Sequence, residues 1–208
     1  YGIKTDGSLW VWGYGNYGSM GLNVGGGPGS AQRISSPTQI PGSWATIATG
    51  DGSKHTLGTK TDGTMWSWGY GGSGQLGLNE AGSAASRSSP TQVGTDATWS
   101  TDTTDPAARQ TCDVGVGCQF AIKADGSLWS WGGNHNGQLG HGPVPANYRR
   151  SSPTQLPGTY QSIHAQNQGP GHRCVYVTKP NGTLYSWGAN TYGYLGHNNR
   201  TSYSSPKQ

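Results

Sequence analysis

The chain has 208 residues, with 37 glycines, 12 prolines and a formal net charge of +4. Such a Gly and Pro content without a period is typical of disordered chains, but 9 Trp and 11 Tyr are more aromatic residues than disordered segments carry. Gly or Pro interrupts almost every stretch, and no apolar run approaches the ~18 residues of a membrane-spanning helix. A mainly helical fold is therefore excluded, and we expect no membrane insertion.

In chain order, the first predicted element is a hairpin whose turn is Asp6-Gly7. Such a pair suits a type I′ turn, in which both central residues need positive φ. A strand is predicted over residues 8–12, because this segment is rich in aromatic and other large apolar residues. Ser-Ser-Pro, ending at Pro37, then predicts an edge strand, because proline at an edge costs no ladder hydrogen bond.

The same elements recur three more times in the same order. Each unit has an Asp-Gly or Asn-Gly turn, a strand that ends in Trp-Gly, a Leu-Gly or Met-Gly pair and a Ser-Ser-Pro segment. The units cover approximately residues 1–52, 53–115, 116–171 and 172–208 of a single repeat domain, 1–208. The glycines are therefore periodic, which predicts a repeat fold and not disorder. We expect the Trp-Gly tryptophans to form the repeated core: Trp12, Trp68, Trp131 and Trp187.

The third unit reads W-G-x-N-x-x-G-Q-L-G from Trp131 to Gly140, and the other units depart from it modestly, with Gly15 and Gly71 in place of the Asn. In this pattern the whole chain resembles the regulator-of-chromosome-condensation repeat family. The resemblance implies an all-β fold: a β-propeller with four visible repeats, as an arc of a larger, six- or seven-bladed ring. The low charge and the Ser/Thr/Gly-rich strands look like those of a bacterial or phage member.

Five arginines fall in the variable segments between the Leu-Gly or Met-Gly pair and Ser-Ser-Pro. They are Arg33, Arg87, Arg149, Arg150 and Arg200. On equivalent loops of a propeller they form a discontinuous basic rim, which is the candidate partner-binding site. Two interpretations stay open, because the arginines either keep an exposed loop soluble or steer an anionic partner toward it. The turn tyrosines, such as Tyr14 and Tyr192, are likewise open between turn packing and partner contact.

The sequence lacks the spacing of a catalytic, cofactor or metal site, so we predict none of the three. It contains no C-x-x-C pair, no G-x-S-x-G elbow and no G-x-x-x-x-G-K-[ST] phosphate loop. Three cysteines do not make a disulfide framework, although Cys112 and Cys118 enclose a short loop and could be either bridged or packed. His55, Cys118 and Cys174 share one repeat position, which the resemblance places among packed residues near the propeller axis.

These features predict a non-enzymatic propeller scaffold or binding module. We expect a virion or cell-surface structural protein that mediates adhesion or assembly, extracellular or on the virion surface and part of a larger assembly. The expected partner is a protein or an anionic surface glycan, while the charge permits nucleic acid without favouring it. The alternative is the activity for which the family is named, guanine-nucleotide exchange on a small GTPase combined with chromatin binding.

Overall fold

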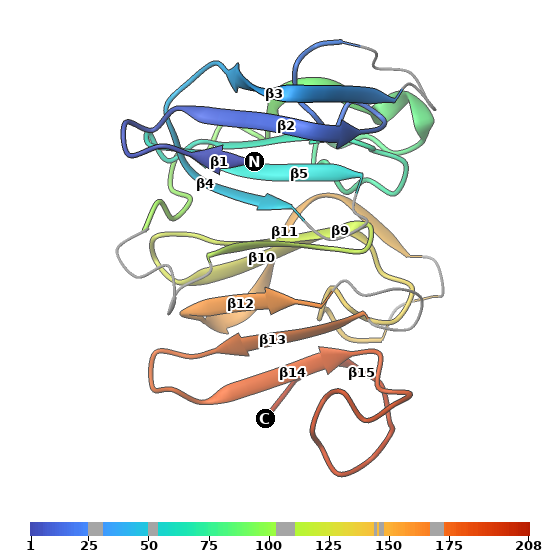
Figure 1. Cartoon of the computed structure of the whole chain (residues 1–208). Coiled ribbons are helices and arrows are strands. Elements are labelled where there is room, and N and C mark those ends of the chain that lie inside the picture. The colour runs from blue at the N-terminus through green and yellow to red at the C-terminus, as the bar shows by residue number, and fades with distance from the viewer. Residues whose placement is uncertain (25–30, 50–53, 103–110, 144, 146–147, 167–172) are drawn as a thin grey trace.

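The computed structural model describes residues 1–24, 31–49, 54–102, 111–143, 145, 148–166 and 173–208. These residues contain strands β1 to β15 and a short 3-10 helix at Ser83–Ala85. The strands form four antiparallel sheets that follow one another from the N-terminus to the C-terminus (Figure 1). The all-β propeller architecture is therefore confirmed.

The four sheets are named blades 1 to 4 in chain order. Blade 1 has β1 (Gly2–Ile3), β2 (Leu9–Gly15) and β3 (Gln32–Ile40). Blade 2 has β4 (Trp44–Thr49), β5 (His55–Lys60), β6 (Met65–Gly69) and β7 (Arg87–Gln92). Blade 3 has β8 (Cys112–Gly115), β9 (Cys118–Ile122), β10 (Ser127–Gly133) and β11 (Arg149–Thr159). Blade 4 has β12 (Ser162–Ala165), β13 (Cys174–Thr178), β14 (Leu184–Gly188) and β15 (Tyr203–Lys207).

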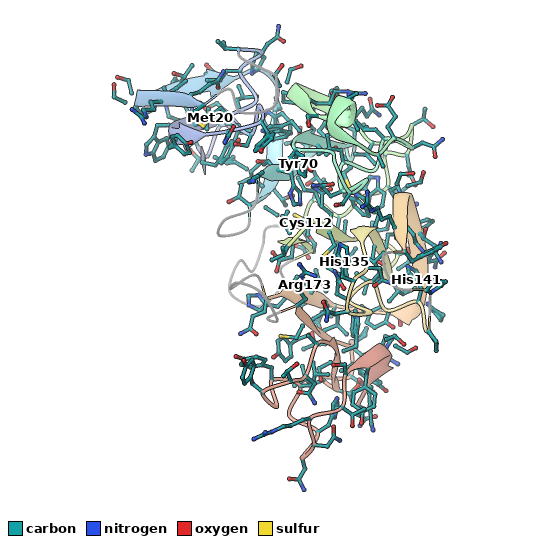
Figure 2. All side chains as sticks on the ribbon, turned by 90° about the vertical axis from the view of Figure 1, so that its right-hand side faces the viewer. Met20, Tyr70, Cys112, His135, His141 and Arg173 are labelled. Atoms are coloured by element: carbon teal, nitrogen blue, oxygen red, sulfur yellow. The ribbon has the colours of Figure 1, made fainter. Side chains whose placement is uncertain are left out.

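Within each blade, strands that are consecutive in the chain pair with each other. The Ser-Ser-Pro strands β3, β7, β11 and β15 lie at one edge of their sheets, as the prolines predict. At the other edge, β8 contacts β4 of the preceding blade and β12 of the following blade. Blades 2 to 4 begin one strand before the sequence units 53–115, 116–171 and 172–208, because this inner strand comes ahead of the hairpin. In Figure 2 the sheets follow an open arc, with Cys112 of β8 toward its concave side.

The hairpin turns differ from the predicted type I′ geometry. Gly7 has a φ of 80°, whereas Asp6 has no positive φ. The Gly7 amide donates to the Lys4 carbonyl (2.9 Å) and the Lys4 amide donates to the Ser8 carbonyl (3.0 Å). This is a three-residue loop, in which a type I turn is followed by one left-handed glycine. The Asp6 Oδ1 atom accepts the Ser8 amide (2.9 Å), so the Asp side chain stabilises the turn without a left-handed backbone of its own.

The core lies between blades, where the Trp-Gly tryptophans pack. Trp68, Trp131 and Trp187 are each 0% exposed, and each indole contacts the blade before its own. Trp12 is 48% exposed, so the prediction that it is a core residue is wrong. The reason is positional: among the described residues, blade 1 has no preceding blade against which this indole could pack.

Candidate partner-binding face

The strand ends divide the molecule into two faces. The hairpin turns that contain Gly7, Gly63, Gly126 and Gly182 lie on one face, named here the Asp-Gly face. The Trp-Gly pairs lie at the opposite strand ends, on the Trp-Gly face. Strand pairing puts the rim arginines there: Arg33 pairs with Tyr14, Arg87 with Gly69, Arg149 with Gly133 and Arg150 with Gly132. Arg200 lies in the loop before β15, whose Tyr203 pairs with Gly188.

Two of the rim arginines are held by groups of blade 2. The Arg87 guanidinium forms an ion pair with Glu80, with Nη2 2.7 Å from Oε2. The Arg149 Nη1 atom donates to the Gly72 carbonyl at 3.1 Å, which joins blade 3 to its neighbour. At these positions the arginines therefore stabilise loops as well as adding positive charge to the face.

The other three rim arginines differ in how exposed they are. Arg150 is half-buried, and its guanidinium lies 5.2 Å from the ring centroid of Tyr148. Arg33 and Arg200 are exposed. The structure thus brings the predicted row onto one face but leaves its members with unequal access to a partner.

A cavity of about 340 Å³ opens on the same face and is lined by residues of blades 2, 3 and 4. Lys54, His135 and Arg173 bring positive or titratable groups to it, and Figure 2 labels Tyr70, His135 and Arg173 on the three blades. The repeat pattern does not predict Lys54 and Arg173 as part of this face, because the corresponding residue of blade 3 is Gly117. The sequence offers one signal for them, since Lys54 directly precedes His55 and Arg173 directly precedes Cys174.

The turn tyrosines of this face divide between packing and exposure. The rings of Tyr17 and Tyr70 meet edge to face with centroids 4.9 Å apart, and the Lys54 Nζ atom lies 4.8 Å from the Tyr17 ring. Tyr14 and Tyr192 are 63% and 68% exposed. Tyr17 and Tyr70 therefore serve turn packing, whereas partner contact by Tyr14 and Tyr192 stays a prediction.

The lysines of the Asp-Gly face interact with groups of the fold itself. One lysine stands two residues before each turn Asp or Asn and lies over an aromatic ring of the next strand. The Nζ-to-centroid distances are 4.2 Å for Lys4 over Trp10, 3.7 Å for Lys60 over Trp66, 4.3 Å for Lys123 over Trp129 and 4.5 Å for Lys179 over Tyr185. Hydrogen bonds to Ser8, with help from Lys4, hold the pKa of Asp6 below its usual range. This face is close to charge balance.

The cysteines are free and buried, so Cys112 and Cys118 are not bridged. Cys112 lies in the core between blades 2 and 3, while Cys118 lies in the core between blades 3 and 4, on the opposite side of the same sheet. Burial raises the pKa of Cys112 to about 11 and that of Cys118 to about 12, which disfavours the reactive thiolate. Across the described ranges, no three His, Cys, Asp or Glu residues gather as metal ligands would, and no helix is long and apolar enough to span a membrane.

The histidines that follow Leu-Gly serve the fold. His141 Nε2 lies 2.9 Å from the Ser130 hydroxyl, and His197 Nε2 lies 3.0 Å from the Ser186 hydroxyl. Burial, together with the charge of Arg150, lowers the pKa of His141 to about 4. It is therefore neutral at physiological pH and adds no charge to the face.

Comparison with known families agrees with this geometry. The model of the regulator of chromosome condensation (RCC1) repeat matches residues 6–58, 62–120, 125–166 and 181–208. A second RCC1 repeat model matches residues 45–75. The chain belongs to the RCC1 repeat family. Most of each blade of this RCC1-repeat chain falls within a matched range.

Relatives of this RCC1-repeat chain are larger proteins. The ultraviolet-B receptor UVR8 of Arabidopsis thaliana is 30% identical over 76% of the chain and 32% of UVR8. The mitochondrial RCC1 domain-containing protein RUG3 of the same plant is 29% identical over 93% of the chain and 41% of RUG3. The chain thus spans less than half the length of either relative.

Two solved structures of a yeast protein share the fold. Yeast RCC1 (Prp20) bound to Kap60 has a TM-score of 0.72 and 19% identity, over 99% of this chain and 45% of that one. Prp20p from Saccharomyces cerevisiae, described with its binding properties to Gsp1p and histones, has a TM-score of 0.68 and 20% identity, over 99% of this chain and 48% of that one. At these identities the likeness shows the fold alone.

The expectation of a virion or extracellular location is wrong. RUG3 is mitochondrial by name, and yeast Prp20p is described with its binding properties to Gsp1p and histones. They are eukaryotic, so they lend no support to a bacterial or phage origin. The expectation of a surface protein rested partly on the Gly/Ser content. The structure gives that content a different cause, because these residues meet the needs of turns, bulges and edge strands that every blade repeats.

Proposed function

We propose that this chain is a non-enzymatic RCC1-type module that binds another macromolecule through its Trp-Gly face. Small GTPases and chromatin proteins are the partner classes to test. Yeast Prp20p, which shares the fold, is described as binding Gsp1p and histones, and yeast RCC1 is solved bound to Kap60. These relatives favour a role in nucleotide exchange or chromatin binding over an adhesive role at a surface. The descriptions of the two structures name no glycan as a partner.

The observation that carries the proposal is the uneven distribution of charge. Every arginine that the structure describes lies on the Trp-Gly face, together with Lys54. The acidic residue on that face, within the described ranges, is Glu80, and it is paired with Arg87. The turn carboxylates instead accompany lysines that lie over rings on the Asp-Gly face. Such a one-sided field steers an acidic partner to the Trp-Gly face.

The test compares two charge-matched triple variants. Lys54→Gln, Arg149→Gln and Arg173→Gln together neutralise three cations of the Trp-Gly face. Affinity for a small GTPase, or for nucleosomes through their acidic DNA, is expected to fall by about tenfold, the effect of three surface charge contacts of about 0.5 kcal/mol each. The loss should shrink as salt is added, because screening weakens the same contacts in the unaltered protein.

The control variant, Lys4→Gln, Lys60→Gln and Lys179→Gln, removes equal charge from the Asp-Gly face. It should bind like the unaltered protein once both are shown to be folded by circular dichroism. Stimulated release of nucleotide from the GTPase would assign exchange, and binding to nucleosomes without nucleotide release would assign the chromatin role. Equal losses in both variants, or no binding to either partner at low salt, would overturn the proposal.

A further inference from the structure

Two neighbouring junctions of the arc contain the same groove. The first groove, between blades 1 and 2, has a volume of about 660 Å³, and the second groove, between blades 2 and 3, has a volume of about 400 Å³. Each is lined by two tryptophans and a lysine at equivalent repeat positions. These are Trp44, Trp66 and Lys60 in the first groove, and Trp99, Trp129 and Lys123 in the second. Because a described blade bounds each groove on both sides, a chemical difference between them is informative.

In each groove the ammonium group of the lysine lies against both indoles. The Nζ-to-centroid distances are 3.7 Å from Lys60 to Trp66, 5.4 Å from Lys60 to Trp44, 4.3 Å from Lys123 to Trp129 and 5.0 Å from Lys123 to Trp99. The ring quadrupoles attract the cation and hold it at this place in the groove. Each groove therefore contains one positioned positive charge beside an aromatic surface.

In the second groove this ammonium group binds a carboxylate of the chain itself. Lys123 forms an ion pair with Asp96, and the two side chains are 13% and 35% exposed. The hydrogen bond from Lys123, with a second one from Thr98, lowers the pKa of Asp96 to about 2. The Asp96 carboxylate is therefore charged at neutral pH, and the fold itself shows which group the indole-flanked ammonium accepts.

The first groove lacks this carboxylate. Asp96 belongs to a connection of five residues, 94–98, whereas the equivalent connection in the first groove, 41–43, has three residues and no acid. Among the described residues, no carboxylate forms an ion pair with Lys60. Asp62, the nearest acid in the sequence, uses its Oδ1 atom within its own turn. The ammonium group of Lys60 is thus available to a carboxylate from outside the chain.

The walls of the first groove offer apolar area beside this charge. Leu22, Ile34 and Pro90 line the groove together with the two indoles. Small-molecule sites typically combine apolar walls with a few polar groups that orient the ligand, in volumes of about 300–1,000 Å³. A single cation among such walls favours a ligand with one carboxylate and an apolar body.

We propose that the first groove binds a small carboxylic acid with a flat apolar body. Its carboxylate pairs with the ammonium group of Lys60, as Asp96 pairs with Lys123. Its apolar body lies against the indole of Trp66 and the ring of Pro90. The ammonium group of Lys60 belongs to the Asp-Gly face, so this site does not depend on the function proposed for the Trp-Gly face.

The first test compares 2-naphthoate with 2-naphthamide, a probe of the same shape without the charge. In NMR spectra, 2-naphthoate is expected to shift the indole N–H resonances of Trp44 and Trp66 with a Kd of about 1 mM, an affinity typical of a ligand of its size. The amide should bind about tenfold more weakly, because it cannot pair with an ammonium group. Equal affinities, or no shift at concentrations well above the expected Kd, would overturn the proposal.

Lys60→Gln and Lys123→Gln form a matched pair of variants, because each removes an ammonium group that lies against two indoles. Lys60→Gln should weaken the binding of 2-naphthoate about tenfold, to the level of the amide. Lys123→Gln should leave the shifts of Trp44 and Trp66 as they are in the unaltered protein. The same spectra show whether each variant is folded. A folded Lys60→Gln variant that binds 2-naphthoate with undiminished affinity would refute the assigned role of Lys60.

Asp96→Asn tests for a gain of binding in the second groove. Asparagine keeps the Oδ1 atom that accepts the Thr98 amide (2.9 Å), but it leaves Lys123 without a charged partner. In this variant 2-naphthoate should also shift the indole resonances of Trp99 and Trp129, which it should leave unmoved in the unaltered protein. If the folded variant shows no new shifts, or if the unaltered protein already shows them, the proposal is wrong.

Discussion

One repeat position shows how a single residue sets the pH response of a junction. His55, Cys118 and Cys174 occupy this position in blades 2, 3 and 4, and each is at most 3% exposed. A thiol at this position is neutral in both the folded and the unfolded chain. An imidazole binds a proton more readily in the unfolded chain than in the folded one, where it is buried. Burial lowers the pKa of His55 to about 4, from an ordinary value near 6.5.

We expect His55→Cys, the residue that blades 3 and 4 use, to flatten the acid side of the stability profile. Because the folded pKa is depressed, His55 contributes full stability above about pH 6.5 and loses it as the pH falls toward about 4. The free energy of unfolding of the unaltered chain should therefore drop by about 3 kcal/mol more than that of the variant over this range. Urea unfolding at a series of pH values measures the difference, and parallel profiles would contradict it.

At the scale of the element, each blade depends on a bulge at the Trp-Gly glycine. Pairing in blade 1 shifts register between Val11 and Gly13, and Gly13 has a φ of 100°. The same shift occurs in blade 2 between Ser67 and Gly69, where φ is 97°. The bulge redirects the chain from the strand into the turn that accepts the next tryptophan.

Gly69→Ala and Gly13→Ala distinguish two costs at this glycine position, that of a left-handed backbone and that of a close contact with the Cβ atom. Both impose a left-handed conformation on alanine, which costs about 1–2 kcal/mol. At Gly69 the new Cβ would also lie 2.3 Å from the Lys54 carbonyl oxygen, whereas at Gly13 nothing lies within 4 Å. Gly69→Ala should therefore lower the free energy of unfolding by about 2 kcal/mol more than Gly13→Ala. Equal losses in urea unfolding would show that the close approach is relieved by movement of the backbone.

At the scale of the whole molecule, stability resides in the contacts between neighbouring blades, as in other repeat proteins. The hydrophobic clusters each join two blades, and each is centred on a buried tryptophan of the later blade. A tryptophan buried between two blades is therefore expected to contribute more to the free energy of unfolding than one that is half exposed.

Trp68→Ala and Trp12→Ala test this difference in the free energy of unfolding. Trp68 is fully buried in the junction of blades 1 and 2, so its removal should cost about 3–5 kcal/mol. Removal of the half-exposed Trp12 indole should cost about 1 kcal/mol or less. Urea unfolding of the two variants makes the comparison. A large loss for Trp12→Ala would mean that its indole packs within blade 1.

The sequence by itself determined the repeat, the all-β class, the edge position of the Ser-Ser-Pro strands and the row of five rim arginines. These follow from local chemistry that recurs at fixed spacing, because turn glycines, edge prolines and strand tryptophans act within one unit. The turn type was predicted wrongly, since Asp6-Gly7 fits both a two-residue and a three-residue loop and only the hydrogen bonds of Lys4 distinguish them.

Only the tertiary structure decided which equivalent residues have equivalent environments. Trp12 and Trp68 share a motif, yet one is exposed and the other buried, because burial depends on the neighbouring blade and not on the unit itself. The tertiary structure also brings Lys54 and Arg173, from different blades, to one cavity of the Trp-Gly face.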